Sequence, residues 1–136
     1  MLSISTKTQY GLVALLELTE YYNKSLVQIN DIVRRRNVPK NYLEQILNRL
    51  HKAGIVKSVR GNKGGYKLGA HPDEISLKNV VASLEGVLEL HNNKICPALD
   101  EVLEQVEQSV SKILDIPLSM LLERQKTLQQ QIMFSI

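Results

Sequence analysis

Residues 39–68 read PKNYLEQILNRLHKAGIVKSVRGNKGGYKL, and this stretch decides the fold. Its first part places Leu and Ile side chains at helical spacing between Leu43 and Leu50. Pro39 fits the first turn of that helix, because its missing N–H has no partner to lose there. Gly54 follows the last apolar position and supplies a left-handed stop. The first part of the stretch therefore predicts one amphipathic helix.

The second part of the stretch predicts a β-hairpin. Residues 55–59 form the first strand, residues 60–65 a flexible turn rich in glycine, and residues 66–68 the returning strand. The basic side chains of the hairpin are Lys57, Arg60, Lys63 and Lys67. No acidic residue accompanies them, which favours contact with a polyanion over an incidental hairpin on a helical domain.

Two helices are expected before this stretch. The first begins near Ser5 or Thr6, whose hydroxyls can accept the first backbone N–H groups of a helix. The second is short, starts near Ile29 and ends at residues 34–36, which are three arginines. Three helices followed by a basic hairpin predict a winged helix-turn-helix, mostly α with a small β-wing. In that fold the third helix enters the major groove and the wing reaches the backbone or minor groove.

The chain beyond residue 70 is expected to hold a fourth helix, a loop and two further helices. Ser76 can cap a short helix that ends at Gly86. We expect a DNA-binding domain at residues 1–86, a loop at 87–97, and dimerisation and C-terminal helices at 98–136.

Two long helices are expected after the loop. In the first, apolar residues recur at spacings of 4, 3, 4 and 3, at Leu99, Leu103, Val106, Val110 and Ile113. This period predicts a coiled-coil seam between two copies of the chain, although a helix folded back on its own domain would also be amphipathic. Pro117 starts a last helix that ends at about residue 131 and leaves a short apolar tail.

The net charge of +3 conceals an asymmetry along the chain. Residues 1–70 carry 12 Lys and Arg against 4 Asp and Glu, whereas residues 71–136 carry 5 against 10. Between Arg34 and Lys67, ten basic side chains accompany a single acid, Glu44. A focused positive field suits a polyanion, and nucleic acid is the first candidate. A solvated charged face, or a surface that docks an acidic protein, would have the same composition.

Composition excludes several other classes of protein. Hydrophobic residues make up 43% and charged residues 23%, as in ordinary globular proteins. No apolar run is long enough to span a bilayer, and the N-terminus lacks a signal-peptide core. A single cysteine fits a reducing cytoplasm. No enzyme is expected, because the glycine-rich run at residues 60–65 precedes a strand, whereas a phosphate-binding loop opens a helix.

Three stretches carry a specific resemblance: ISTKTQYGLVALLEL at 4–18, the run from YLEQ to GGYKL at 42–68, and EISLKNVVASLEG at 74–86. In these the chain resembles the Rrf-two family of bacterial transcription regulators. That family includes the iron–sulfur cluster regulator, the nitric-oxide-sensing repressor and the cysteine-metabolism repressor. The resemblance implies a dimeric winged-helix protein that binds double-stranded DNA and dimerises through its long C-terminal helix. The leading hypothesis is therefore a homodimeric repressor that binds a pseudo-palindromic operator.

The resemblance places the reading of bases at the start of the third helix, at Lys40, Asn41, Tyr42, Glu44 and Gln45. Gln and Asn side chains can pair with adenine, and a carboxylate can accept from cytosine N4. A salt bridge to a nearby Lys or Arg is an alternative role for Glu44. Packing between helices is an alternative role for Tyr42.

Further DNA contacts are expected at the wing and at the N-terminus. The resemblance assigns Arg60 to a narrow minor groove and links Lys7 and Tyr10 to phosphate contacts. Lys63 joins them as a basic residue of the acid-free wing. Position 38 is Val where a Ser or Thr cap would be conventional.

The loop departs from the pattern of many relatives, which use three cysteines there to sense iron–sulfur status or nitric oxide. This chain offers only Cys96, and even two copies would supply just two Cys96 and two His91. A cluster usually needs four ligands, mostly thiolates, so no cofactor is expected. The chain is similar to the cysteine-metabolism repressor branch, part of which is governed by a partner enzyme of sulfur metabolism. A metal or redox sensor based on Cys96 and His91 is the alternative, and a small buried hydrophobe is the plain role for Cys96.

Overall fold

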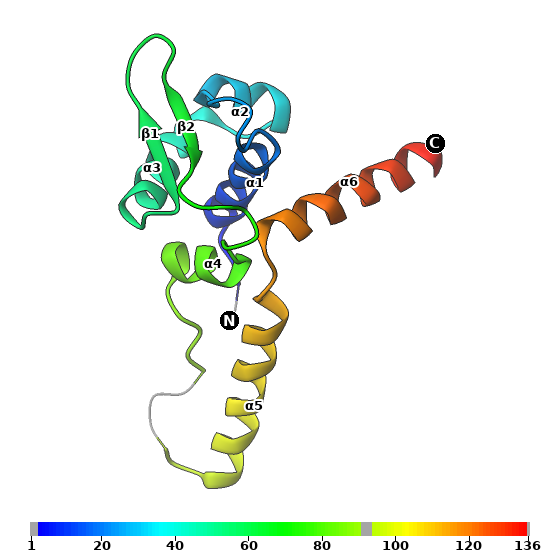
Figure 1. Ribbon diagram of the computed structural model, residues 1–136. Helices are drawn as coiled ribbons and strands as arrows, with labels where there is room; N and C mark the ends of the chain where they lie inside the picture. Colours follow the sequence, from blue (N-terminus) through cyan, green and yellow to red (C-terminus); the bar gives the residue numbers. More distant parts are fainter. Residues whose placement is uncertain (1–2, 91–93, 136) are drawn as a thin grey trace.

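The computed structural model describes residues 3–90 and 94–135 of the chain (Figure 1). The helices are α1 (Thr6–Glu20), α2 (Ile29–Arg36), α3 (Lys40–Lys52), α4 (Leu77–Glu85), α5 (Pro97–Leu114) and α6 (Leu118–Ser135). The strands are β1 (Val56–Val59) and β2 (Gly65–Leu68). The predicted fold class, mostly α with a small β-wing, is confirmed.

Helix α1 lies at the centre of the molecule, with α2, α3 and α4 around it (Figure 1). It begins as predicted, because Ser5 Oγ accepts a hydrogen bond from the Thr8 N–H at 3.2 Å. Gly11 lets α1 approach its neighbours closely: a Cβ there would lie 2.9 Å from Ile46 Cγ2. A larger residue at position 11 would therefore push α1 away from α3.

The turn between α2 and α3 is built on Asn37, which adopts the left-handed conformation with φ 55°. Val38 follows and is only 2% exposed. Its side chain packs in the core, where a Ser or Thr at this position would conventionally cap the helix. Pro39 has extended backbone angles and precedes α3, which starts at Lys40. The prediction that Pro39 lies in the first turn of the helix was wrong by one residue.

The wing is an antiparallel pair in which Val56 lies opposite Leu68 and Val59 opposite Gly65. It is anchored at one side by a bridge between Val27 and Tyr66, with N–H···O distances of 3.0 and 2.8 Å. Gly65 is required by this anchor, because a Cβ there would lie 2.7 Å from the Val27 carbonyl oxygen. The wing is therefore fixed to the residues that lead into α2.

Of the two C-terminal helices, α5 begins away from the core and runs toward it, whereas α6 starts at the core and leaves it (Figure 1). Leu118 is fully buried in the same hydrophobic cluster as α1 and α3, and Leu122 is 8% exposed. Backbone bonds join the start of α4 to the start of α6: Leu77 N–H donates to Ile116 O, and Leu118 N–H donates to Ile75 O, both at 2.8 Å. The division of domains at residue 86 stays a prediction, and α6 contributes to the core of the DNA-binding part.

Helix α6 is longer than expected. It runs to Ser135 instead of ending at about residue 131, because residues 118–135 contain neither Gly nor Pro to stop a helix. Over the described ranges 3–90 and 94–135, no helix is long and apolar enough to cross a membrane.

Candidate nucleic-acid interface

Helix α3 presents a polar face beside a buried one. Its buried residues are Leu43, Ile46, Leu47 and Leu50, which pack in the core. The predicted base readers on its other face are not buried in the core: Lys40, Asn41, Glu44 and Gln45. Tyr42 is the exception, since it is half-buried and packs against the core. In the part of the chain that the structure describes, Glu44 forms no ion pair, so the alternative of a salt bridge at this residue is wrong.

A groove of about 660 Å³ separates α3 from the wing. Lys40 and Glu44 line it from α3, and Arg60 lines it from the wing. Sequence reasoning missed further polar side chains of this groove, among them Gln28, Asn30, Asn48, His51 and Ser58. The four-residue spacing of Lys40, Glu44 and Asn48 along one helix face could have found Asn48. Gln28 and Ser58 join the groove only through the three-dimensional fold.

Lys7, Tyr10 and Tyr42 form a second cluster, where α1 crosses the start of α3. The rings of Tyr10 and Tyr42 stack with centroids 5.6 Å apart. The Lys7 ammonium lies 5.8 Å from the centroid of the Tyr42 ring, within the range of a cation–π contact. The structure therefore brings together three residues that the sequence placed on two separate helices.

Gln45 belongs with this second cluster and not with the groove. It shares a hollow of about 150 Å³ with Lys7 and Arg49. Arg49 was missed by sequence reasoning, and its guanidinium donates to the Leu84 carbonyl at 2.9 Å. Glu44 and Gln45, although adjacent in sequence, therefore face two different hollows of the surface.

The N-terminus of α1 is held by a carboxylate from α4. Glu85 Oε1 accepts hydrogen bonds of 2.7 Å from the Ser5 N–H and from the Thr8 hydroxyl. These bonds from Ser5 and Thr8 lower the pKa of Glu85 below its ordinary value of 4.5. The carboxylate occupies the position where a helix N-terminus attracts anions.

The wing carries positive charge that no acid of the described residues pairs with. Lys57 and Lys67 lie directly opposite one another on the two strands, and both are exposed. Arg60 and Lys63 lie in the connection between the strands and are also exposed. Like charges at opposite positions of a sheet are unfavourable in the free protein. Their presence favours a polyanionic partner that would relieve the repulsion.

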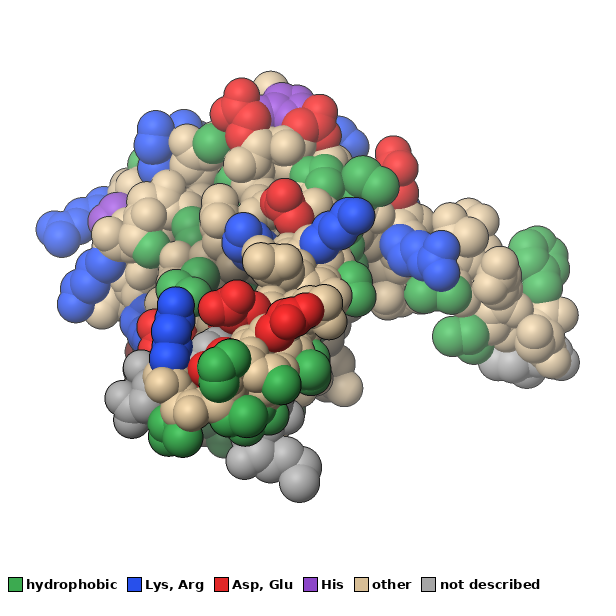
Figure 2. Space-filling view, turned by 90° about the horizontal axis from the view of Figure 1, so that it is seen from below, with side chains coloured by type: hydrophobic (Ala, Val, Ile, Leu, Met, Phe, Trp, Pro, Cys, Tyr) green, Lys and Arg blue, Asp and Glu red, His purple; other side chains and the backbone are tan. Residues whose placement is uncertain are grey.

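Helix α5 leaves apolar side chains in solvent. Of the five predicted seam residues, Leu99 is 53%, Val106 40% and Ile113 72% exposed, while Leu103 and Val110 are half-buried. Figure 2 looks at the molecule from the end toward which α5 extends, and hydrophobic side chains gather there beside acidic ones. The described part of a single chain leaves this stripe in contact with water.

The cysteine and histidine side chains of this chain do not fit the ligand set of an iron–sulfur cluster. Cys96 is its one cysteine, and its thiol is exposed directly before α5. His91, the other candidate ligand, lies outside the described residues. Over residues 3–90 and 94–135 no three side chains of His, Cys, Asp or Glu lie together as a metal site would need. One thiolate per chain leaves the ligand set of a cluster unfilled.

Known proteins resemble this chain over most of its length. The Rrf2 family model, described as iron-dependent transcriptional regulator, matches residues 4–124. The chain is 35% identical over 118 residues to the HTH-type transcriptional regulator CymR of Bacillus subtilis, and the match covers 84% of each protein.

Two solved structures have the same fold. One is CymR, described as the global cysteine regulator of B. subtilis, with a TM-score of 0.83 and 34% identity over 91% of this chain and 98% of that one. The other is IscR of T. potens, with a TM-score of 0.78 and 35% identity over 94% of this chain and 91% of that one. Both likenesses extend beyond the winged helix to the C-terminal helices.

Proposed function

Because this chain belongs to the Rrf2 (Rrf-two) family of DNA-binding transcriptional regulators, we propose that it is a homodimeric repressor of a pseudo-palindromic operator. The family and the similar structures are regulators and not enzymes. The observation that carries the proposal is the groove between α3 and the wing, which is lined by Lys40, Glu44 and Arg60.

In this proposal α3 enters the major groove of DNA with its N-terminal half. Its exposed polar side chains, Asn41, Glu44 and Gln45, read base edges, because amide and carboxylate groups match the donors and acceptors of particular bases. Lys40 lies at the first turn and contacts a phosphate beside them. Tyr42 acts mainly by holding α1 against α3.

The wing and the N-terminus of α1 hold the protein on the DNA backbone. Arg60 enters the minor groove, and Lys63 contacts a phosphate near it. Lys7 and Tyr10 contact the backbone on the other side of α3. The proposal is supported by the positions of these residues, because the wing lies on one flank of α3 and the Lys7 cluster on the other.

Dimerisation uses the apolar stripe of α5. Leu99, Val106 and Ile113 are exposed in one chain, and a second copy of the helix would cover them. Two recognition helices held in this way would read two half-sites about one helical turn apart. The two-fold axis of such a dimer corresponds to the symmetry of a pseudo-palindromic operator.

Control by a protein, and not by a cofactor, completes the proposal. The donor set lacks the thiolates of a cluster, and the likeness to CymR extends over nearly the whole chain. A regulatory partner enzyme of sulfur metabolism is therefore the proposed source of the signal. The protein would act in the cytoplasm, because that is where bacterial DNA lies.

Selection of bound DNA from a random pool with the purified protein tests the function. We expect an enriched motif with two inverted half-sites whose centres lie about 10 base pairs, or a multiple of that, apart. Recovery of no motif at all, with affinity that depends on salt alone, would contradict sequence-specific regulation.

A further inference from the structure

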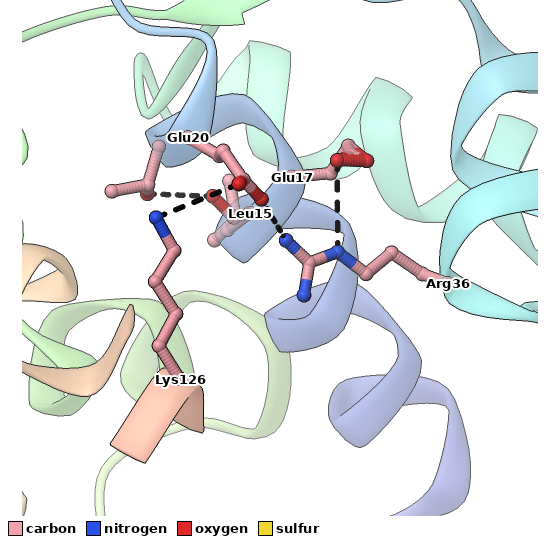
Figure 3. A network of polar contacts seen from close by, with 6 residues as sticks. Leu15, Glu17, Glu20, Arg36 and Lys126 are labelled. Atoms are coloured by element: carbon pink, nitrogen blue, oxygen red, sulfur yellow. Dashed lines mark hydrogen bonds and ion pairs between the residues drawn. The ribbon is translucent and has the colours of Figure 1, made fainter. Parts of the chain in front are cut away.

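A partly buried set of charges connects α6 to the helix-turn-helix (Figure 3). Arg36, at the end of α2, places Nε 3.6 Å from Glu17 Oε1 and Nη2 2.6 Å from Glu20 Oε2. Lys126 of α6 places Nζ 3.5 Å from Glu20 Oε1. Figure 3 shows Arg36 and Lys126 reaching Glu20 from opposite sides. We call these four residues the Arg36 network.

The centre of this network is taken out of water. Glu17 is 2% exposed, and its Oε2 has no hydrogen-bond partner among the described residues. The side chain of Arg36 is 14% exposed. Charges in such a place are held in position, because removing one partner leaves another charge buried and unpaired.

The network acts on the turn that presents α3. Arg36 is the last residue of α2, the left-handed Asn37 follows, and the buried Val38 leads into α3. A shift of the Arg36 guanidinium therefore moves the end of α2 and the start of α3 together. No other charged side chain of α6 forms an ion pair with α1 or α2 within the described ranges.

Lys126 balances the charge of the network. Without it, the single guanidinium of Arg36 faces the two carboxylates of Glu17 and Glu20. Lys126 is itself 54% exposed, so a modest movement of α6 would transfer its ammonium to water. Glu20 would then be free to draw Arg36 away from Glu17.

We infer that Lys126 is a positioning residue for DNA recognition: through Glu20 and Arg36 it sets the orientation of α3 according to the position of α6. The inference rests on the proposed role of α3 in reading bases. It gives the C-terminal helix a route to the DNA-binding surface. The steps from Lys126 to Glu20 and from Glu20 to Arg36 are ion pairs, and the backbone of the turn at residues 37–39 completes the route to α3.

The test compares Lys126→Glu with Arg124→Glu. Both variants make the same charge change on the same helix, and Arg124 is exposed with no ion pair in the described part of the chain. The readout is the ratio of the Kd for nonspecific DNA to the Kd for the selected operator, at a temperature where all variants are folded. We expect Lys126→Glu to lower this ratio about fivefold relative to Arg124→Glu. Lys126→Arg, which keeps the positive charge, should retain the wild-type ratio. Equal ratios for the two charge-reversal variants would overturn the inference.

A double-mutant cycle separates positioning from general weakening. Lys126→Gln should lower the operator ratio in the wild-type background and have no effect in a Glu20→Gln background, because the path through Glu20 is already broken. Additive effects of the two changes would overturn the inference. If the wild-type protein itself prefers no operator, the proposed function fails and the inference fails with it, whereas a normal wild type with additive effects contradicts the inference alone.

Discussion

The rings of Tyr10 and Tyr42 stack with centroids 5.6 Å apart and planes at 27° to one another. The contact joins α1 to the first turn of α3, and Lys7, whose ammonium lies over the Tyr42 ring, lines a hollow together with Gln45. Both rings are half-buried and pack against the core. The stack therefore fixes the start of the recognition helix.

Removing the Tyr42 ring should reduce stability and DNA binding together. Tyr42→Ala is expected to lower the free energy of unfolding by about 2 kcal/mol, because it removes a half-buried aromatic ring and its stack. Tyr42→Phe should change the unfolding free energy by less than about 0.5 kcal/mol, since the ring remains. Urea unfolding checks both values. A Phe variant as unstable as the Ala variant would show that the hydroxyl, and not the ring, holds the contact.

The wing should strengthen DNA binding through contacts between its basic side chains and DNA phosphates. Arg60→Ala and Lys63→Ala are each expected to weaken operator binding and to reduce the slope of log Kobs against log salt by about 1. Lys112→Ala, which removes a charge from α5, is the control and should leave the slope unchanged. If both wing variants bind like the wild type at several salt concentrations, the wing is not a DNA contact.

Glu44 should act on specificity rather than on total affinity. Glu44→Ala removes an acid from the most basic surface, so binding to nonspecific DNA is expected to strengthen. Discrimination at one base position should fall by about 1–3 kcal/mol, which repeated selection from random DNA would reveal as a relaxed position. An unchanged motif would instead place Glu44 outside the set of base readers.

The buried Glu17 predicts a particular pH dependence of stability. Burial raises the pKa of Glu17 above 4.5, although Arg36 and Arg35 act to lower it. The folded protein therefore binds this proton more tightly than the unfolded chain does. The resulting stabilisation is complete below pH 4.5 and is lost as the pH rises through the folded pKa.

Comparing the wild type with Glu17→Gln isolates this contribution. The stability of the wild type relative to Glu17→Gln should fall as the pH rises from about 4.5 toward neutrality, and then level off. Glu85, whose pKa is lowered, is present in both proteins and cancels. Urea unfolding at a series of pH values measures the difference. A difference that is constant with pH, or that rises, would contradict the assignment.

Local pattern was sufficient to predict most of the fold. The cap at Ser5, the arginines that end α2 and the stop at Gly54 are encoded in short stretches and were confirmed. The error at Pro39 arose because a proline before a helix and one in its first turn are both compatible with its fixed φ. The end of α6 was missed because its last residues contain no Gly or Pro that would mark a stop, and they are exposed, so no packing pattern marks the end either.

Only the part of the candidate site that lies on the single helix α3 could be predicted from the sequence. The face of α3 follows from helical spacing, whereas Gln28 and Ser58 reach the groove through the wing anchor at Val27. The Arg36 network could not be predicted either. It joins residues more than 100 positions apart, and nothing in local sequence indicates that Lys126 meets Glu20.

Sedimentation of a Val106→Glu variant decides whether α5 holds two chains together. The substitution places a carboxylate opposite its own twin in the α5 seam, which should cost about 3–5 kcal/mol and dissociate the dimer. Gln105→Glu adds the same charge at an exposed position next to the seam and serves as the control. We expect wild type and Gln105→Glu to sediment as dimers that bind one operator per two chains. Val106→Glu should sediment as a folded monomer with weak, salt-sensitive DNA binding and no operator preference. A Val106→Glu protein that stays dimeric would contradict the proposed seam, and a monomer that keeps full specificity would contradict the need for a dimer.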